Sequence, residues 1–258
     1  NTPKVIGGVT PECLRKATAL YSHVIDTVVP VSSTETAEMV KLLENTFRAV
    51  NIGLVNEVAI MSRRLGVDPF EVIRAAATKP FGFMPFFPGP GLGGHCIPID
   101  PLYLSWKLRS LKYQARFIDL ADTINSAMPE YVVERVSDAL NDQKKPINGS
   151  KILIYGVAYK RDVEDVRESP AFTIMHDLRE RGADISYMDP HALRVNEDGF
   201  DLVSVDPNAS FAAYDVVVIV TDHKLLERER LLREAALIVD TRDAMRGIEG
   251  DRSKIYGL

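Results

Sequence analysis

A cysteine lies in the stretch of this 258-residue sequence that is richest in glycine and proline. Residues 79–101 contain six prolines and five glycines, and Cys96 is followed four positions later by Asp100. This composition excludes a regular helix or strand and predicts a long structured loop, a type of segment that often carries function. Exposed backbone N–H groups in such a loop favour a reactive thiolate, so Cys96 is a candidate nucleophile, although inert buried cysteines are commoner.

The same loop contains a glycine pattern that could bind phosphate. Residues 89–94 (GPGLGG) satisfy the dinucleotide pattern G-x-G-x-x-G, but no strand precedes them, and prolines at 98 and 101 interrupt the helix that should follow. We therefore do not expect a dinucleotide site here. The glycines instead allow the backbone to approach a ligand closely and to offer bare N–H groups to oxyanions.

Polar residues interrupt an otherwise apolar helical stretch. Glu38, Lys41 and Asn45 are three and four positions apart and so share one helix face. A solvated stripe is the simplest explanation. The alternative is a stripe that faces a site, in which Lys41 and Asn45 supply a cation and an amide to a developing oxyanion.

Basic residues are expected at one edge of a parallel sheet in the last third of the sequence. Lys160, Arg161 and Arg167 follow a short apolar strand that ends at Gly156, and Arg242 follows another that ends near Asp240. Ligands of doubly wound sheets bind beyond the carboxyl ends of the strands, so these cations are placed to meet phosphate.

The elements that must position these residues fall into two kinds. Residues 4–32 predict a strand, a helix and a second strand, and a capping box from Ser32 to Glu35 opens a helix that runs to Gly66. Helical pattern returns over 102–141, where Pro129 should kink or divide the helix. After a polar linker at 144–149, short apolar strands at 151–156, 184–189, 202–205, 216–221 and 236–240 alternate with helical segments near 169–181 and 224–234. This alternation predicts a parallel sheet covered on both faces.

Charge and composition exclude several classes of protein. The sequence has 31 basic and 36 acidic residues, a formal net charge of −5, so we expect no nucleic-acid partner. No apolar run is long enough to cross a membrane, and two cysteines cannot form a disulfide framework, which favours the cytoplasm. We also expect no metal ion.

Several stretches together resemble the UDP-glucose/GDP-mannose dehydrogenase family of nucleotide-sugar 6-dehydrogenases, in the family's order and spacing. They are residues 36–45 (TAEMVKLLEN), 51–57 (NIGLVNE), 89–101 (GPGLGGHCIPIDP), 156–160 (GVAYK) and 166–170 (VRESP). Residues 78–86 (TKPFGFMPF) look most like the UDP-N-acetylglucosamine 6-dehydrogenase branch, with N-acetylmannosamine and glucose enzymes as alternatives.

The resemblance implies oxidation of the C6 alcohol of a UDP-sugar, UDP-N-acetylglucosamine being preferred, to a carboxylate with NAD as cofactor. Cys96 would be the catalytic nucleophile that holds C6 as a thiohemiacetal and then a thioester. Lys41 and Asn45 would stabilise oxyanions, and Asp100 would help to activate the hydrolytic water. The implied contacts to the nucleotide sugar are Phe86, Phe87, Gly93, Lys160 and Arg242, and Arg167 would reach toward NAD.

The fold class implied is α/β, with an all-α central dimerisation domain over 33–145 followed by a Rossmann-like parallel α/β domain that binds UDP over 146–258. Residues 1–32 are expected to be the remnant of a missing N-terminal dinucleotide-binding domain, so a chain of this extent would be inactive alone. The resemblance also implies a cytoplasmic homodimer, formed through the central helices, that serves nucleotide-sugar metabolism and polysaccharide biosynthesis.

Two rival functions stay open. One is a non-catalytic module that binds a nucleotide sugar and dimerises. The other is a cysteine hydrolase, in which Cys96 would act with a distant histidine such as His176, His191 or His223.

Overall fold

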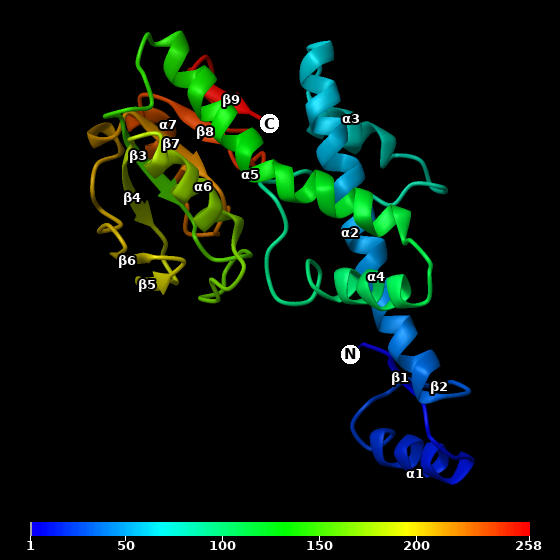
Figure 1. The fold of residues 1–258 in the computed structure, drawn as a ribbon. Coiled ribbons are helices and arrows are strands. Elements are labelled where there is room, and N and C mark those ends of the chain that lie inside the picture. The colour runs from blue at the N-terminus through cyan, green and yellow to red at the C-terminus, as the bar shows by residue number, and fades with distance from the viewer. Residues whose placement is uncertain (1) are drawn as a thin grey trace.

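The computed structural model describes residues 2–258, which begin with a small parallel unit. Strand β1 (Lys4–Ile6), helix α1 (Pro11–Tyr21) and strand β2 (Val28–Pro30) follow one another, and β1 pairs with β2 in parallel. The Thr10 hydroxyl accepts a hydrogen bond from the Cys13 N–H and caps α1, as expected of a threonine before a proline. This unit lies at the end of α2 that is farthest from the large sheet (Figure 1).

Four helices form the central part of the molecule. They are α2 (Thr34–Leu65), α3 (Pro69–Ala76), α4 (Asp100–Ser110) and α5 (Arg116–Asp142). Ser33 caps α2 by accepting from the Thr36 N–H, so the predicted cap at Ser32 was wrong by one residue. Gly66 ends α2 in the left-handed conformation, at a φ of 71°, as a glycine stop predicts.

The break in the second helical stretch does not lie at its proline. Pro129 is buried within a continuous α5, and the interruption is the turn between Ser110 and Arg116, so of the two predicted effects of Pro129, a kink or a division of the helix, the division was wrong. Tight packing explains the result, because residues around Pro129 lie among fully buried side chains such as Met128 and Val132. Packing on both sides of a helix can hold it together despite a missing backbone donor.

The C-terminal part is a five-stranded parallel sheet with helices on its faces. The strand order is β4-β3-β7-β8-β9, with every neighbouring pair parallel. Its elements are β3 (Lys151–Tyr155), α6 (Pro170–Glu180), β4 (Asp184–Met188), β7 (Val216–Ile219), α7 (Arg228–Glu234), β8 (Ile238–Asp240) and β9 (Ile255–Gly257), with a 3-10 turn at Phe211–Ala213. The chain order places the topological switch between β3 and β7, and the Rossmann-like α/β prediction is confirmed.

A hairpin departs from the predicted sheet. Strands β5 (Arg194–Glu197) and β6 (Phe200–Val203) pair antiparallel, so the apolar residues near 202 do not belong to the parallel sheet as predicted. Asp198 and Gly199 form the two-residue connection, and both have positive φ, as a type I′ turn requires.

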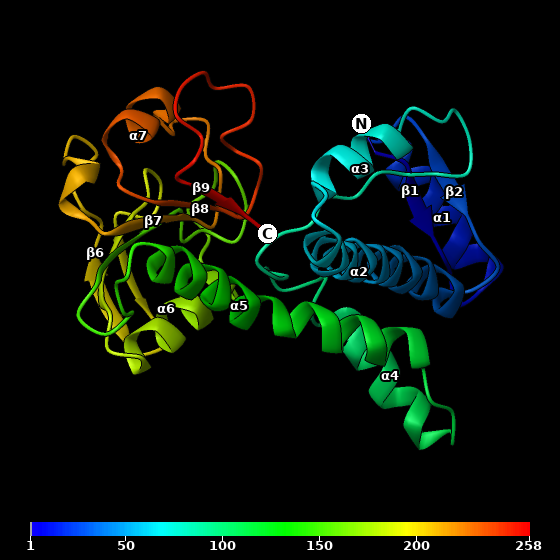
Figure 2. The same ribbon diagram turned by 90° about the horizontal axis from the view of Figure 1, so that it is seen from above.

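Helix α5 joins the two parts. Its second half packs on one face of the sheet, where Val132, Val136 and Leu140 share a core with Ile152 and Val218. Figures 1 and 2 show α5 running from α2 and α4 to the sheet. The loop that carries the cysteine is therefore held at a fixed position relative to the carboxyl edge of the sheet.

Candidate functional site

Cys96 lies in the turn that leads into α4, four residues before Asp100. Its backbone carbonyl accepts a hydrogen bond from the Asp100 N–H at 2.9 Å, which places the thiol-bearing residue and the carboxylate one helical turn apart. The Cys96 side chain is half-buried and free of disulfides. A nucleophile at this position is accessible and has a carboxylate close by.

The Asp100 carboxylate gathers the polar residues of α2. Its Oδ2 accepts a hydrogen bond from Asn45 Nδ2 at 2.7 Å and lies 3.3 Å from Lys41 Nζ. Asn45 is only 3% exposed, and its Oδ1 accepts from Arg48 NH1 at 3.0 Å. The stripe on α2 therefore faces the cysteine loop, and three of the predicted catalytic residues, Lys41, Asn45 and Asp100, are in direct contact.

The glycine-rich loop contacts the C-terminal part of the molecule. A side chain at Gly93 would collide with Tyr159, and the Gly94 N–H donates to the Arg167 carbonyl at 3.3 Å. A side chain at Gly89 would collide with the Arg242 guanidinium. The glycines thus allow the loop to pack closely against the basic edge of the sheet, and their predicted approach to a ligand stays a prediction.

A buried pair of asparagines anchors this loop, and the sequence analysis did not assign it a role. Asn56 Oδ1 accepts from the Gly89 N–H at 3.0 Å, and Asn56 Nδ2 donates to Asn125 Oδ1 at 2.9 Å. Asn125 Nδ2 donates in turn to the Ala49 carbonyl at 3.0 Å. Asn56 is completely buried. This burial points to a structural role for Asn56, and the sequence alone does not show it.

The predicted cations lie on two strand ends, as expected. Lys160 is exposed and lies over the Tyr159 ring at 5.6 Å, and it has no acidic partner within residues 2–258. Arg242 donates from Nε to the Val220 carbonyl at 2.9 Å, and burial lowers the pKa of its guanidinium. Neither cation forms a salt bridge with a described residue, although Asp222 and Asp240 lie near enough to Arg242 to act on its charge, so both can still bind an anion.

Arg167 differs from these two because it already pairs with a carboxylate. Its guanidinium binds Asp165 through two bonds, of 2.9 and 2.7 Å, which lowers the pKa of Asp165 to about 2. A cofactor that used Arg167 would have to share it with Asp165.

The two predicted phenylalanines pack on the central helices. The Phe86 ring meets Phe47 of α2 edge-on at 5.7 Å, and Phe87 stacks on Phe70 of α3 at 6.3 Å. Phe87 is nearly half exposed. Both rings therefore form one side of the loop that precedes Cys96.

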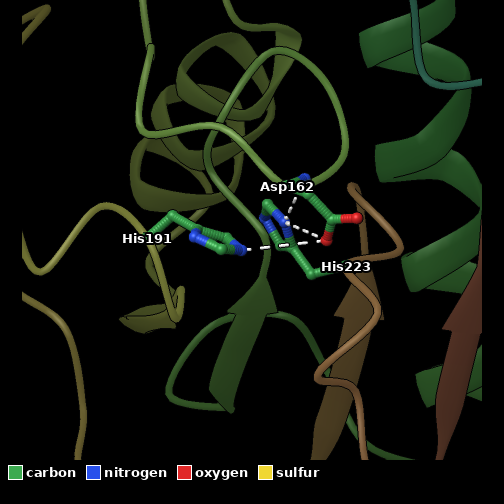
Figure 3. A group of neighbouring side chains, drawn as sticks. All are labelled: Asp162, His191 and His223. Atoms are coloured by element: carbon green, nitrogen blue, oxygen red, sulfur yellow. Dashed lines mark hydrogen bonds and ion pairs between the residues drawn. The ribbon is translucent and has the colours of Figure 1, made fainter.

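Two groups in the described residues have ligand atoms close enough together to hold a metal ion, the exposed His176, Asp177 and Glu180 on α6 and a more buried group shown in Figure 3. In the cluster of Asp162, His191 and His223, the Nδ1 of His223 accepts the Asp162 N–H at 2.9 Å and its Nε2 binds Asp189 at 3.1 Å. The Asp162 carboxylate accepts from the Lys224 N–H at 3.0 Å and pairs with its ammonium at 3.2 Å. The buried Nε2 of His191 forms no hydrogen bond with a described residue, but it lies 3.8 Å from Asp162 Oδ1. The cluster is thus held by its own hydrogen bonds.

The histidines do not support a hydrolase. Among residues 2–258, no histidine forms a hydrogen bond with the Cys96 thiol, and His191 and His223 are occupied in the cluster beside β3. His176 lies on the exposed face of α6, where it pairs with Glu180. A cysteine–histidine dyad therefore has no geometric basis here.

None of the helices within residues 2–258 is long and apolar enough to cross a bilayer.

The fold and the site together define a class: a Rossmann-like α/β domain joined by a long helix to a cysteine-bearing helical domain. Family models match both parts, the central domain of the UDP-glucose/GDP-mannose dehydrogenase family over residues 35–127 and its UDP-binding domain over 153–247. The chain belongs to the UDP-glucose/GDP-mannose dehydrogenase family.

Relatives and solved structures agree with this assignment. The chain is 38% identical over 220 residues to a UDP-N-acetyl-D-mannosamine dehydrogenase of Methanococcus maripaludis, with 85% of this chain and 49% of that protein covered. It is 34% identical over 223 residues to a UDP-N-acetyl-D-glucosamine 6-dehydrogenase of Pseudomonas aeruginosa, with 85% and 52% covered. The structure of a UDP-D-ManNAc dehydrogenase from Pyrococcus horikoshii superimposes with a TM-score of 0.83 at 30% identity and covers 99% of this chain and 59% of that one. The chain spans about half the length of the curated relatives it matches.

Proposed function

We propose that this chain supplies the substrate-binding and nucleophile-bearing part of an NAD-dependent UDP-sugar 6-dehydrogenase. One observation carries the proposal: a single carboxylate, Asp100, holds Lys41 and Asn45 one turn from Cys96, in a loop that also touches the basic edge of the sheet. A nucleophile, a cation, an amide and a phosphate-binding edge are the groups that oxidation at C6 of a nucleotide sugar requires. The family assignment and the relatives' names support the same reaction.

In this proposal the residues of the chain act on the C6 carbonyl. The Cys96 thiolate adds to the C6 aldehyde and holds it covalently, so that the intermediate cannot escape. Lys41 Nζ and Asn45 Nδ2 leave their contacts with the Asp100 carboxylate and bind the oxyanion that forms at C6. Their positive charge and N–H group stabilise this oxyanion. The freed Asp100 carboxylate then accepts a proton from the water that hydrolyses the thioester.

NAD would supply the hydride acceptor for both oxidations. The described residues do not form a dinucleotide site by themselves, because the glycine pattern at 89–94 lies in a loop with no strand before it. The β1–α1–β2 unit has parallel strands, and the turn after β1 contains Gly7 and Gly8 but not the pattern G-x-G-x-x-G. We therefore assign to this chain only Arg167 as a contact that could reach NAD.

Lys160 and Arg242 would bind the diphosphate of the substrate, with Phe86, Phe87 and Gly93 forming the part of the loop that covers the nucleotide sugar. The two cations come from the ends of β3 and β8, as ligand groups of a parallel sheet should. The C2 substituent is proposed to be an N-acetyl group, with UDP-N-acetylglucosamine first and UDP-N-acetylmannosamine and UDP-glucose as the alternatives; the relatives' names include both acetylated sugars.

We infer further that two copies associate through the central helices. Large apolar side chains remain exposed on three helices that pack against one another, and exposed apolar surface of this kind marks a protein interface. They are Met39, Leu43, Phe47, Leu54 and Met61 of α2, Tyr103 and Trp106 of α4, and Phe117 and Leu120 of α5. A second copy of this chain is the simplest partner for this surface. We also propose that the protein is cytoplasmic, because both of its cysteines are free.

Two measurements test the proposal. Calorimetry on the 258-residue chain should show UDP binding that weakens on Lys160→Met. NADH formation should be measured with the whole protein, meaning this chain with any further segment its gene encodes, across a panel of UDP-sugars. Binding of UDP without any turnover of the panel would favour the non-catalytic module instead.

A further inference from the structure

The segment Val157–Asp162, which leaves β3 and carries Lys160, has no helix or strand to hold its shape. Gly156 begins it at a φ of 81°, where an added side chain would collide with the Thr221 backbone, so this segment runs directly against the end of β7. The Thr221 hydroxyl donates to the Ala158 carbonyl at 2.7 Å. The position of the Lys160 ammonium must therefore be set by contacts from other elements.

Asp189, the residue after β4, holds the start of this segment. Its Oδ2 accepts hydrogen bonds from the N–H groups of Val157 and Ala158 at 2.8 and 3.0 Å. Its Oδ1 accepts from the N–H groups of His191 and Ala192 at 2.8 and 3.0 Å. The carboxylate is 1% exposed, so these bonds are made without competition from water.

His223 holds the other end of the segment. The Asp162 N–H donates to its Nδ1 at 2.9 Å, and Asp162 has a φ of 60°, a left-handed conformation that such an anchor stabilises. Because a backbone N–H can only donate, Nδ1 must accept, and the ring proton then lies on Nε2. That proton points at Asp189 Oδ2, 3.1 Å away, in a fully buried contact.

The two anchors are thus one connected unit. Burial raises the pKa of Asp189, but the hydrogen bonds from His223 and from the backbone of Ala192, His191 and Ala158 outweigh it and lower the pKa to about 2. The carboxylate is therefore ionised, and its bond to the ring is charge-assisted. Figure 3 shows the His223 ring beside the Asp162 carboxylate, with His191 on the other side of that ring and directed at the same carboxylate.

We propose that Asp189 and His223 are positioning residues for nucleotide binding: together they clamp both ends of the segment 157–162 and so fix Lys160 where it meets a diphosphate. This rests on the proposed function, because it takes UDP as the ligand of Lys160. The clamp requires the neutral ring with its proton on Nε2, so a side chain with one acceptor and one donor can replace it, whereas an apolar ring cannot.

The test is calorimetric UDP binding to the 258-residue chain in a double-mutant cycle. His223→Phe keeps the ring shape and removes both bonds, and we expect the Kd for UDP to rise about tenfold, the effect of one well-made hydrogen bond. His223→Gln keeps an acceptor and a donor and should stay within about threefold of the parent. His176→Phe, on the exposed face of α6, is the matched control and should change nothing.

The cycle separates positioning from general weakening. On a Lys160→Met background, His223→Phe should cost no further affinity, because the group that it positions is gone. If His223→Phe does not fold, Thr221→Val replaces it in the cycle, since it removes only the bond to the Ala158 carbonyl and keeps the side-chain shape. An equal loss of affinity on both backgrounds overturns the inference, as does no loss on either.

The outcomes also separate the inference from the proposed function. If the parent chain binds UDP and Lys160→Met weakens it while the His223 and Thr221 variants do not, the inference fails and the proposed function stands. If the parent chain does not bind UDP, both fail.

Discussion

The buried asparagine pair gives a prediction that the chain can test without substrate. Asn56→Leu keeps the branched shape of the side chain but removes the acceptor of the Gly89 N–H and the donor to Asn125 Oδ1. Each buried polar group left without a partner costs about 1–3 kcal/mol. Leucine recovers part of this by burying apolar surface, so we expect the free energy of unfolding to fall by about 3 kcal/mol.

The assay is urea denaturation of the 258-residue chain, and the control lies one turn earlier on α2. Asn51 donates to the Phe47 carbonyl near the surface, so Asn51→Leu should cost less than about 1 kcal/mol. The double variant of Asn56 and Asn125 should cost clearly less than the two single changes added together, because the amides no longer leave each other unpaired. A loss below about 1 kcal/mol for Asn56→Leu, or strict additivity in the pair, would refute this account of the loop anchor.

Three further predictions follow. Cys96→Ala in the whole protein should abolish formation of the sugar acid while UDP affinity stays within about twofold, measured by product analysis and calorimetry. Asp189→Asn should lower the free energy of unfolding by about 2 kcal/mol near neutral pH, because the pKa of Asp189 in the folded protein is about 2 and lies below the ordinary 3.8. The ionised Asp189 therefore stabilises the parent above pH 4, and the difference between variant and parent shrinks toward pH 2. Leu43→Glu, at a position 61% exposed in the chain, should convert a dimer to a monomer in sedimentation, with an unchanged circular dichroism spectrum. A difference between Asp189→Asn and parent that stays constant with pH would contradict the second, and a Leu43→Glu dimer would contradict the third.

Local signals predicted much of the fold. Three helices begin with a capping residue followed by a proline, namely those capped by Thr10, Asp68 and Ser169. Such a start depends only on neighbouring residues, because the side-chain oxygen accepts a backbone N–H and the proline fixes the first turn. The buried parallel strands were also predicted from a local signal, the apolar run that each of them forms. The hairpin of β5 and β6 was missed although Asp198 and Gly199 form a known turn pair, because β5 is short and mostly polar and only the apolar run near 202 indicated a strand.

In the candidate site, too, only the features that depend on neighbouring residues in the sequence could be predicted. Helical spacing placed Lys41 and Asn45 on one face, but their contact with Asp100 depends on how α4 packs against α2, which no local pattern contains. Asp189 and His223 were invisible as a pair, since they lie 34 positions apart and each residue type alone carries no signal. Buried polar pairs of this kind are set by tertiary packing, and only a structure shows them.

If the protein oxidises C6 of a UDP-sugar through Cys96, NADH and the sugar acid must form together. NADH formed by the whole protein should be followed together with the sugar acid, using UDP-N-acetylglucosamine and the other UDP-sugars, for the parent and for Cys96→Ala. We predict that the parent forms two NADH for each acid from at least one UDP-sugar, and that Cys96→Ala forms no acid. A parent protein that forms no NADH with any of these sugars, or a Cys96→Ala variant that forms the acid at the parent's rate, would contradict the account.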